Sequence, residues 1–188
     1  MSLAQALARR RLVEPSGPSG AVIEGDYRYL LWRELREERA GGTILWVMLN
    51  PSTADGSEDD PTIRRCLGFA ESWGYGAVEV VNLFAARATD PRDLDRFEDP
   101  VGPRNDAYLT AAARRASRIV CAWGAHRGTE PERRAVEVTN RIVEIDHLWC
   151  LGLTASGQPR HPLYLSADTL LQPYAPRVVA ESFLRSRP

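Results

Sequence analysis

The distribution of apolar residues along the chain predicts an alternation of strands and helices. Four largely apolar runs rich in β-forming residues are typical of strands covered on both faces: 43–49, 77–83, 117–123 and 147–151. Between these runs, apolar residues recur three and four positions apart and predict helices over 61–74, 102–116 and 130–144. Asp60 and Pro61 supply an N-cap and a proline at the first position of the first of these helices. The alternation indicates a mainly parallel sheet with helices on both of its faces.

Two further features precede this alternation. Leucines and alanines from Leu3 to Leu12 indicate an N-terminal helix, and the prolines and glycines of 15–20 indicate a linker after it. We therefore expect residues 1–20 to form a helix and a linker, and residues 21–188 to form a single α/β domain.

A β-hairpin is expected at one edge of the sheet. Short strands over 21–24 and 27–33 flank Gly25 and Asp26, a pair typical of a tight hairpin turn. The hairpin comes before the first parallel strand, so it adds to the α/β unit without interrupting it.

Composition narrows the possible chemistry. All 24 basic residues are arginine, so the side chains offer no amine for a Walker phosphate loop, a pyridoxal Schiff base or a lysine-dependent lyase. With 25 acidic residues the formal net charge is -1, and no strong overall field would draw the chain to nucleic acid or to an anionic membrane. Any nucleic-acid contact would have to come from a local patch.

The cysteines and the apolar runs bear on cofactors and location. Cys66, Cys121 and Cys150 are far apart in the chain, which favours reduced core thiols over a zinc or iron–sulfur site. No apolar run is long enough to span a bilayer, and the N-terminus lacks a secretory apolar core. We expect a cytoplasmic protein with no cofactor, no metal and no membrane partner, and the oligomeric state stays open.

Amide side chains end two of the predicted parallel strands. Asn50 follows the first strand and Asn82 ends the second, at the edge of the sheet where ligands bind in such folds. Pro51 favours an extended backbone at Asn50 and would hold its amide rigidly. Two amides at this edge could orient a water molecule or read a planar heterocycle. The alternative for Asn50 is an Asx turn that closes the strand.

Other polar residues of the same edge are candidates for binding. Arg87 lies in the loop after the second strand and could contact phosphate oxygens. His161 stands between Arg160 and Pro162 in a late loop, where a fixed imidazole could stabilise an anion. His126 follows the third strand, and we interpret it as a structural residue.

Five motifs of the chain resemble a family. They occur in the order Met48-Leu49-Asn50-Pro51-Ser52-Thr53-Ala54-Asp55, Asp60-Pro61-Thr62-Ile63-Arg64-Arg65-Cys66, Val81-Asn82-Leu83-Phe84-Ala85, Ala122-Trp123-Gly124 and Gly157-Gln158-Pro159-Arg160-His161-Pro162-Leu163. Together they resemble the bacterial and phage family called domain of unknown function 1643, over residues 27–171. The name of this family implies no activity.

A more distant resemblance is to the uracil-DNA glycosylase superfamily, which shares the strand ends in Asn-Pro, Asn and Trp-Gly and a late His-Pro loop. It implies a three-layer α/β/α sandwich, hydrolysis of an N-glycosidic bond on a flipped-out base, and a role in DNA repair. By this resemblance Asn50 would position the attacking water, Asn82 would read the base edge, and His161 would stabilise charge on the base. Leu165 would correspond to the leucine inserted into the base stack.

The chain departs from that superfamily at several positions. Ser52, Thr53, Ala54 and Asp55 replace the usual continuation of the Asn-Pro motif, and Leu163 follows His161-Pro162 in place of serine. No aromatic residue matches the base-stacking position directly, where Phe69, Phe84 or Tyr75 could substitute. The iron–sulfur branch would need more cysteines than the chain has.

Three functional hypotheses follow. The first is a monofunctional hydrolase of N-glycosidic bonds in a nucleic acid or nucleotide, with Asn50, His161 and Asp55 as catalytic candidates and Ser52 and Thr53 at the substrate. The second is a non-catalytic module that binds a nucleotide or nucleic acid in the same crevice through arginines, namely Arg64, Arg65, Arg87 and Arg160. The third is a hydrolase of another small planar substrate with Asp55 as the base.

Overall fold

The computed structural model describes residues 11–37, 40–126 and 129–176. The N-terminal helix expected from Leu3 to Leu12 falls almost wholly outside this range, and residues 11–16 have no regular secondary structure. Among the described residues, no helix combines the length and the apolar character that crossing a membrane requires.

The N-terminal hairpin is present as predicted. Strand β1 (Ser19–Glu24) pairs antiparallel with β2 (Tyr27–Glu34) around a turn in which Gly25 adopts a φ of 56°. Glycine fits this left-handed conformation without the steric cost that a Cβ would bring. Strand β2 then pairs antiparallel with β4 (Ala77–Asn82), which attaches the hairpin to the rest of the sheet.

The four central strands are parallel. They are β4, β3 (Thr43–Met48), β5 (Arg118–Cys121) and β6 (Leu148–Cys150), and the full order of the seven-stranded sheet is β1-β2-β4-β3-β5-β6-β7. The short strand β7 (Gln172–Pro173), which the sequence did not indicate, pairs antiparallel with β6. The sheet is therefore mixed, with parallel pairing only at its centre, because the hairpin and β7 add antiparallel strands at the two edges.

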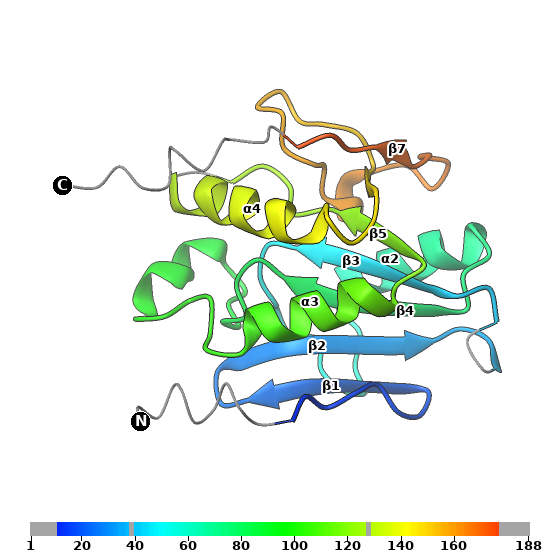
Figure 1. The fold of residues 1–188 in the computed structure, drawn as a ribbon, viewed down its shortest axis with the longest axis horizontal. Helices are drawn as coiled ribbons and strands as arrows, with labels where there is room; N and C mark the ends of the chain where they lie inside the picture. The colour runs from blue at the N-terminus through cyan, green and yellow to red at the C-terminus, as the bar shows by residue number, and fades with distance from the viewer. Residues whose placement is uncertain (1–10, 38–39, 127–128, 177–188) are drawn as a thin grey trace.

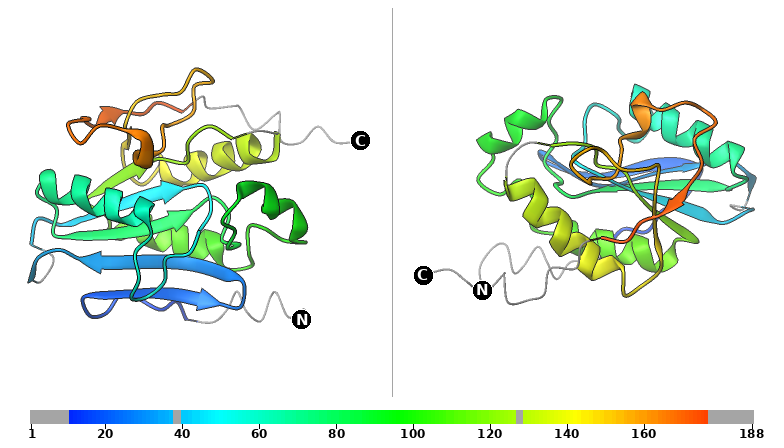
Figure 2. Two further views of the ribbon diagram at one scale, coloured as in Figure 1. Left: turned by 180° about the vertical axis from the view of Figure 1, so that it is seen from behind. Right: turned by 90° about the horizontal axis from the view of Figure 1, so that it is seen from above.

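Helices cover both faces of the sheet (Figures 1 and 2). Helix α2 (Pro61–Ser72) lies on one face, and α3 (Asn105–Arg115) and α4 (Thr129–Ile142) lie on the other. Successive residues of β3 divide between two core clusters, Trp46 packing with the α2 side and Val47 with the α3 and α4 side. This period-two division explains why the central strands are apolar throughout.

Several boundaries differ from the predicted ones. Helix α3 begins at Asn105 because Gly102, with a φ of 84°, forms a turn whose amide bonds to Asp99 at 3.0 Å. Strand β5 ends at Cys121, ahead of the Trp123-Gly124 turn. Two 3-10 helices not indicated by the sequence occupy proline-led turns: η2 (Pro91–Arg96) and η3 (Pro162–Tyr164).

One charged residue lies in the middle of the sheet. Glu79 of β4 is 0% exposed, and Arg115 at the end of α3 donates to both of its carboxylate oxygens at distances of 2.6–3.0 Å. Such a buried pair tolerates the low dielectric because the geometry is bidentate. It also fixes α3 against the strand that carries Asn82.

Candidate functional site

A cavity of about 710 Å³ opens where the carboxyl ends of β3, β4 and β5 meet. Small-molecule sites have volumes of roughly 300–1,000 Å³. The wall is formed by residues from the three strand ends, the start of α2, the segment around η3 and one residue of β2. The cavity therefore lies at the edge of the sheet at which the sequence predicted a binding crevice.

Asn50 lines the cavity directly after β3. Its Nδ2 donates to the backbone oxygens of Ala88 at 2.6 Å and Pro51 at 3.1 Å. These bonds tie the end of β3 to the loop after β4, so the side chain does more than close a local turn. The two donors of Nδ2 are engaged, and Oδ1, the acceptor of the amide, can accept a hydrogen bond from a ligand or water.

Asn82 lines the same cavity from the end of β4. The residue is 2% exposed, and its Oδ1 is buried with no hydrogen-bond partner among the described residues. A buried acceptor left in this state destabilises a fold by about 1–3 kcal/mol. A ligand that brings an N–H or O–H group to this oxygen would remove that penalty.

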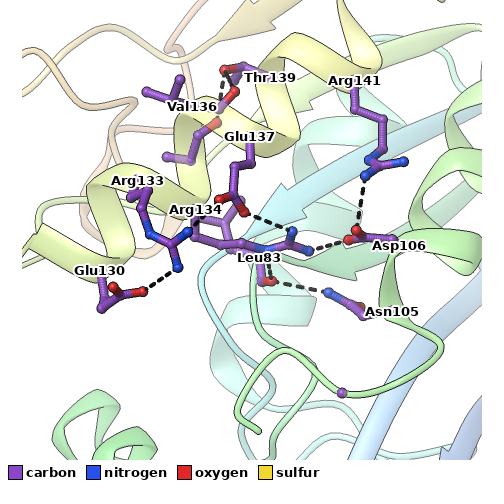
Figure 3. Close-up of polar contacts among 12 residues, drawn as sticks. Leu83, Asn105, Asp106, Glu130, Arg133, Arg134, Val136, Glu137, Thr139 and Arg141 are labelled. Carbon is purple, nitrogen blue, oxygen red and sulfur yellow. Dashed lines mark hydrogen bonds and ion pairs between the residues drawn. The ribbon is translucent and has the colours of Figure 1, made fainter. Parts of the chain in front are cut away.

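The backbone around Asn82 is held from the opposite side of the sheet. The Nδ2 of Asn105 donates to the carbonyl oxygens of Asn82 at 2.9 Å and Leu83 at 3.1 Å. Arg134 also donates to the Leu83 carbonyl at 2.9 Å, and Figure 3 shows Asn105 and Arg134 both bonded to Leu83. Arg134 is 4% exposed and also forms ion pairs with Asp106 and Glu137. These contacts from α3 and α4 fix the end of β4, and hence the wall of the cavity, before any ligand binds.

His161 reaches the cavity from the residue before η3. Its Nδ1 accepts from the Leu163 amide at 3.3 Å, which requires that Nδ1 carries no proton. Burial lowers the pKa of His161 below its ordinary value of 6.5, although the negative charge of Asp60 acts in the opposite direction. At neutral pH the ring is therefore neutral, and its Nε2–H can donate a hydrogen bond.

Gly124 makes room for His161. Its φ is 77°, and a Cβ built on it would lie 3.0 Å from the Cβ of His161. Any larger residue would combine an unfavourable backbone conformation with pressure on the imidazole. The Trp-Gly turn after β5 thus contributes to the site mainly because Gly124 has no side chain.

Arg28 is a lining residue that the sequence analysis missed. It is the second residue of β2 and is 3% exposed, and its guanidinium donates to the Ala54 carbonyl at 2.8 Å. Burial lowers the pKa of Arg28 to about 10, with the charges of Asp60 and Arg87 acting in opposite directions, so the group stays cationic at neutral pH. An arginine between two tyrosines of an amphipathic strand was the available signal.

Asp60 also lines the cavity, although the sequence identified it only as a helix cap. Its Oδ1 accepts from the Ile63 amide at 2.8 Å, which confirms the predicted N-cap of α2. Its negative charge acts on both Arg28 and His161, raising the pKa of each against the effect of burial.

The cavity brings together seven of the eleven site residues predicted from the sequence: Asn50, Ser52, Thr53, Asn82, Arg160, His161 and Leu165. Four others are not among its lining residues: Asp55, Arg64, Phe84 and Arg87.

Asp55 is not placed to act as a catalytic base. Its Oδ1 accepts from the amides of Ser57 at 2.8 Å and Glu58 at 2.9 Å within its own exposed loop. These hydrogen bonds lower the pKa of Asp55, which makes the carboxylate a weaker proton acceptor. The hypothesis of a hydrolase that uses Asp55 as its base therefore loses its main residue.

The remaining three residues are not part of the cavity lining and make contacts elsewhere. Phe84 is 4% exposed and packs in the core cluster that contains α3 and α4, so it cannot stack on a ligand in the cavity. Arg64 is exposed and donates to the Asp59 carbonyl. Arg87 is half-buried, and its charge lowers the pKa of Arg28.

Neither cysteines nor acidic clusters suggest a metal centre in the part of the chain that the structure describes. Cys66, Cys121 and Cys150 are free and buried, and burial raises the pKa of each thiol. No group of three or more potential metal ligands is found in this described part. His126, which follows β5, is not a lining residue of the cavity.

The fold and cavity define an α/β protein with a cavity at the carboxyl ends of the parallel strands of a mixed sheet. A family model described as a protein of unknown function (DUF1643) matches residues 28–163, and the chain belongs to this family. No curated protein and no solved structure matches the chain. The matched range extends from Arg28 to Leu163 and so includes all but the last two lining residues of the cavity.

Proposed function

We propose that the protein is a monofunctional hydrolase of N-glycosidic bonds in a nucleotide or nucleic acid. The observation that carries this proposal is that Asn50, Asn82 and His161, far apart in sequence, line one cavity of about 710 Å³. These are the residues that the distant resemblance to the uracil-DNA glycosylase superfamily assigns to water, base and leaving group. Helices on both faces of the sheet are compatible with the three-layer α/β/α sandwich of that superfamily.

The hydrogen bonds of Asn50 support its role in positioning water. With Nδ2 held by Ala88 and Pro51, Oδ1 can accept a hydrogen bond from a water molecule in the cavity. An amide cannot take a proton at neutral pH, so cleavage of the bond between C1′ and the base nitrogen must run ahead of water attack. The base leaves with the bonding electrons, water adds to the cationic sugar carbon, and its proton passes to solvent or to the released base.

The chemistry of Asn82 and His161 supports recognition and departure of the base. Asn82 offers a buried amide whose Oδ1 lacks a partner among the described residues and can accept from an N–H of the base edge. His161 offers a neutral Nε2–H that can donate to a base carbonyl oxygen as negative charge develops on it. Neither group needs to change protonation during the reaction.

The test is mass-spectrometric detection of free base after incubation with nucleosides, nucleotides and oligonucleotides that carry uracil, hypoxanthine, xanthine or alkylated bases. Asn50→Ala should reduce release by at least about 100-fold, in the range seen for lost catalytic groups. Arg64→Ala, an exposed change outside the cavity, should leave it unaltered. Undiminished release by Asn50→Ala, or no base from any substrate, would overturn the proposal.

A second candidate is a non-catalytic module that binds the same ligand. Asp60 favours it, because this one carboxylate among the lining residues is engaged in capping α2. In that case Asn82→Ala would weaken ligand binding measured by calorimetry, while wild-type protein would form no product from any substrate of the panel.

A further inference from the structure

The ion pairs of the buried arginines set Arg28 apart. Among the described residues four arginines are buried, and Arg33, Arg104 and Arg134 each form an ion pair with a carboxylate. Arg28 forms none with the described residues, and the only hydrogen bond of its side chain there is to the Ala54 carbonyl. Because burial of an uncompensated guanidinium is unfavourable, its charge calls for an anion that the described residues do not provide.

The unpaired Nε of Arg28 and a neighbouring arginine support the same conclusion. Its Nε is buried without a hydrogen-bond partner among the described residues, and the residue belongs to the wall of the cavity. Arg87 lies near Arg28 and its Nε is likewise buried without a partner in the described part of the chain. Two neighbouring guanidinium groups repel each other unless an anion lies near both, and planar guanidinium groups match the oxygens of phosphate.

Asp60 is the negative group that faces this position. Its Oδ1 is engaged by the Ile63 amide at the start of α2, and its charge raises the pKa of Arg28 without forming an ion pair with it. Asp60 therefore moderates the positive charge of the site but does not neutralise it.

We propose that the cavity binds a free mononucleotide whose terminal phosphate lies at Arg28, with Arg87, which is not a lining residue, contributing positive charge nearby. This inference rests on the proposed function, because base and sugar would occupy the part of the cavity lined by Asn50, Asn82 and His161. Arg28 is 3% exposed, so the phosphate has to enter the cavity. A terminal phosphate can do so, whereas a phosphodiester within a strand has a nucleotide on either side.

The size and charge of the molecule favour the same substrate. A cavity of about 710 Å³ suits a single nucleotide. The formal net charge of -1 provides little of the phosphate neutralisation on which binding to nucleic-acid strands depends.

The experiment compares ligands that differ only in the phosphate. Calorimetry would measure binding of adenosine, guanosine, cytidine, uridine and inosine, of their 5′-monophosphates, and of single-stranded oligonucleotides. We expect at least one 5′-monophosphate to bind wild type about 10- to 100-fold more tightly than its nucleoside, as loss of charge-assisted hydrogen bonds implies. Equal affinities, absence of binding by every monophosphate, or tighter binding of an oligonucleotide would each overturn the inference.

Variants locate the phosphate. Arg28→Gln should abolish the advantage of the monophosphate while nucleoside affinity stays within about 2-fold, and Arg28→Lys should restore part of it. Arg64→Gln, exposed and outside the cavity, is the matched control and should keep the full advantage. If Arg28→Gln keeps the advantage and Arg160→Gln at the exposed side loses it, the phosphate lies elsewhere and the assignment is wrong. If Arg28→Gln does not fold, the ligand comparison on wild type and Arg28→Lys still decides.

These binding measurements do not depend on turnover. Base release without a phosphate advantage would refute the mononucleotide inference and keep the hydrolase. A phosphate advantage without base release would refute the hydrolase and keep the phosphate site.

Discussion

Replacement of Asn82 by leucine would separate a ligand-binding role of this amide from a structural one. Asn82 is 2% exposed, and its Oδ1 has no hydrogen-bond partner among the described residues. Leucine has a similar shape, carries no polar atom to desolvate and is better suited to a strand. If Asn82 serves a ligand and lowers the stability of the ligand-free protein, its replacement by leucine should therefore raise that stability.

The expected magnitude follows from the unpaired oxygen. Removing this oxygen relieves a penalty of about 1–3 kcal/mol, and the imperfect fit of leucine in the site reduces the gain in stability. We expect Asn82→Leu to raise the free energy of unfolding by about 1–2 kcal/mol and the Tm by about 2–8 °C for a chain of this size. Ligand binding should be lost at the same time.

Asn105→Leu is the matched control. Asn105 is 0% exposed, but its Nδ2 donates to two carbonyl oxygens. Its Oδ1 is also unpaired among the described residues, so replacement relieves that penalty but removes both donated bonds. Because two bonds are lost for one relieved oxygen, we expect a net loss of about 1 kcal/mol although leucine favours helix. The same substitution should thus change stability in opposite directions at two buried asparagines.

The assay is equilibrium unfolding in urea, followed by tryptophan fluorescence and circular dichroism. The midpoint should rise for Asn82→Leu and fall for Asn105→Leu with unchanged m-values, since a change in m would indicate a different unfolded state. If Asn82→Leu destabilises the protein by more than about 1 kcal/mol, the amide is structural and the reasoning from its unpaired oxygen is refuted.

Three further predictions concern other parts of the structure. Arg115→Met should lower the free energy of unfolding by about 3–5 kcal/mol because Glu79 stays buried without its guanidinium, whereas adding Glu79→Leu should recover most of the loss; an Arg115→Met protein as stable as wild type would contradict this. The pKa of His161 measured by NMR should lie below 6.5, and a midpoint above 6.5 would be inconsistent with a neutral Nε2–H donor. Because folding lowers this pKa, the contribution of His161 to stability should be complete above about pH 6.5 and should decline as the pH falls below that value. Gly124→Ala should weaken ligand binding at least about 10-fold, because the new Cβ would lie 3.0 Å from His161; unchanged affinity in calorimetry would show that the imidazole is not held by this contact.

Much of the secondary structure could be predicted because its signals are local. The apolar runs identified β3 to β6, and Asp60-Pro61 identified the start of α2. The antiparallel edge strand β7 was missed, since two residues ending in proline carry no periodicity. The attachment of β2 to β4 was also invisible, because pairing between distant segments depends on the whole sheet.

For the candidate site, the position of a residue along the chain predicted the edge of the sheet at which it lies, but not the direction of its side chain. Residues at strand ends, such as Asn50 and Asn82, could be assigned because parallel strands end at one edge. Asp55 was expected beside Asn50 but does not line the cavity, because its carboxylate bonds to its own loop, which the sequence does not show. Arg28 was missed because it reaches the site through the tertiary pairing of the hairpin with the sheet.

The position of Arg28 on the hairpin has a consequence for folding stability. The hairpin contributes one wall of the cavity, while Asn50 and Asn82 belong to the central strands. A ligand that contacts both parts links them non-covalently, and binding energy then resists separation of β2 from β4. Local opening at this seam should become rarer as ligand concentration rises, so the amides of β2 would exchange with solvent more slowly in ligand-rich surroundings. The time for which the edge hairpin stays attached to the sheet would thus increase with the ligand concentration.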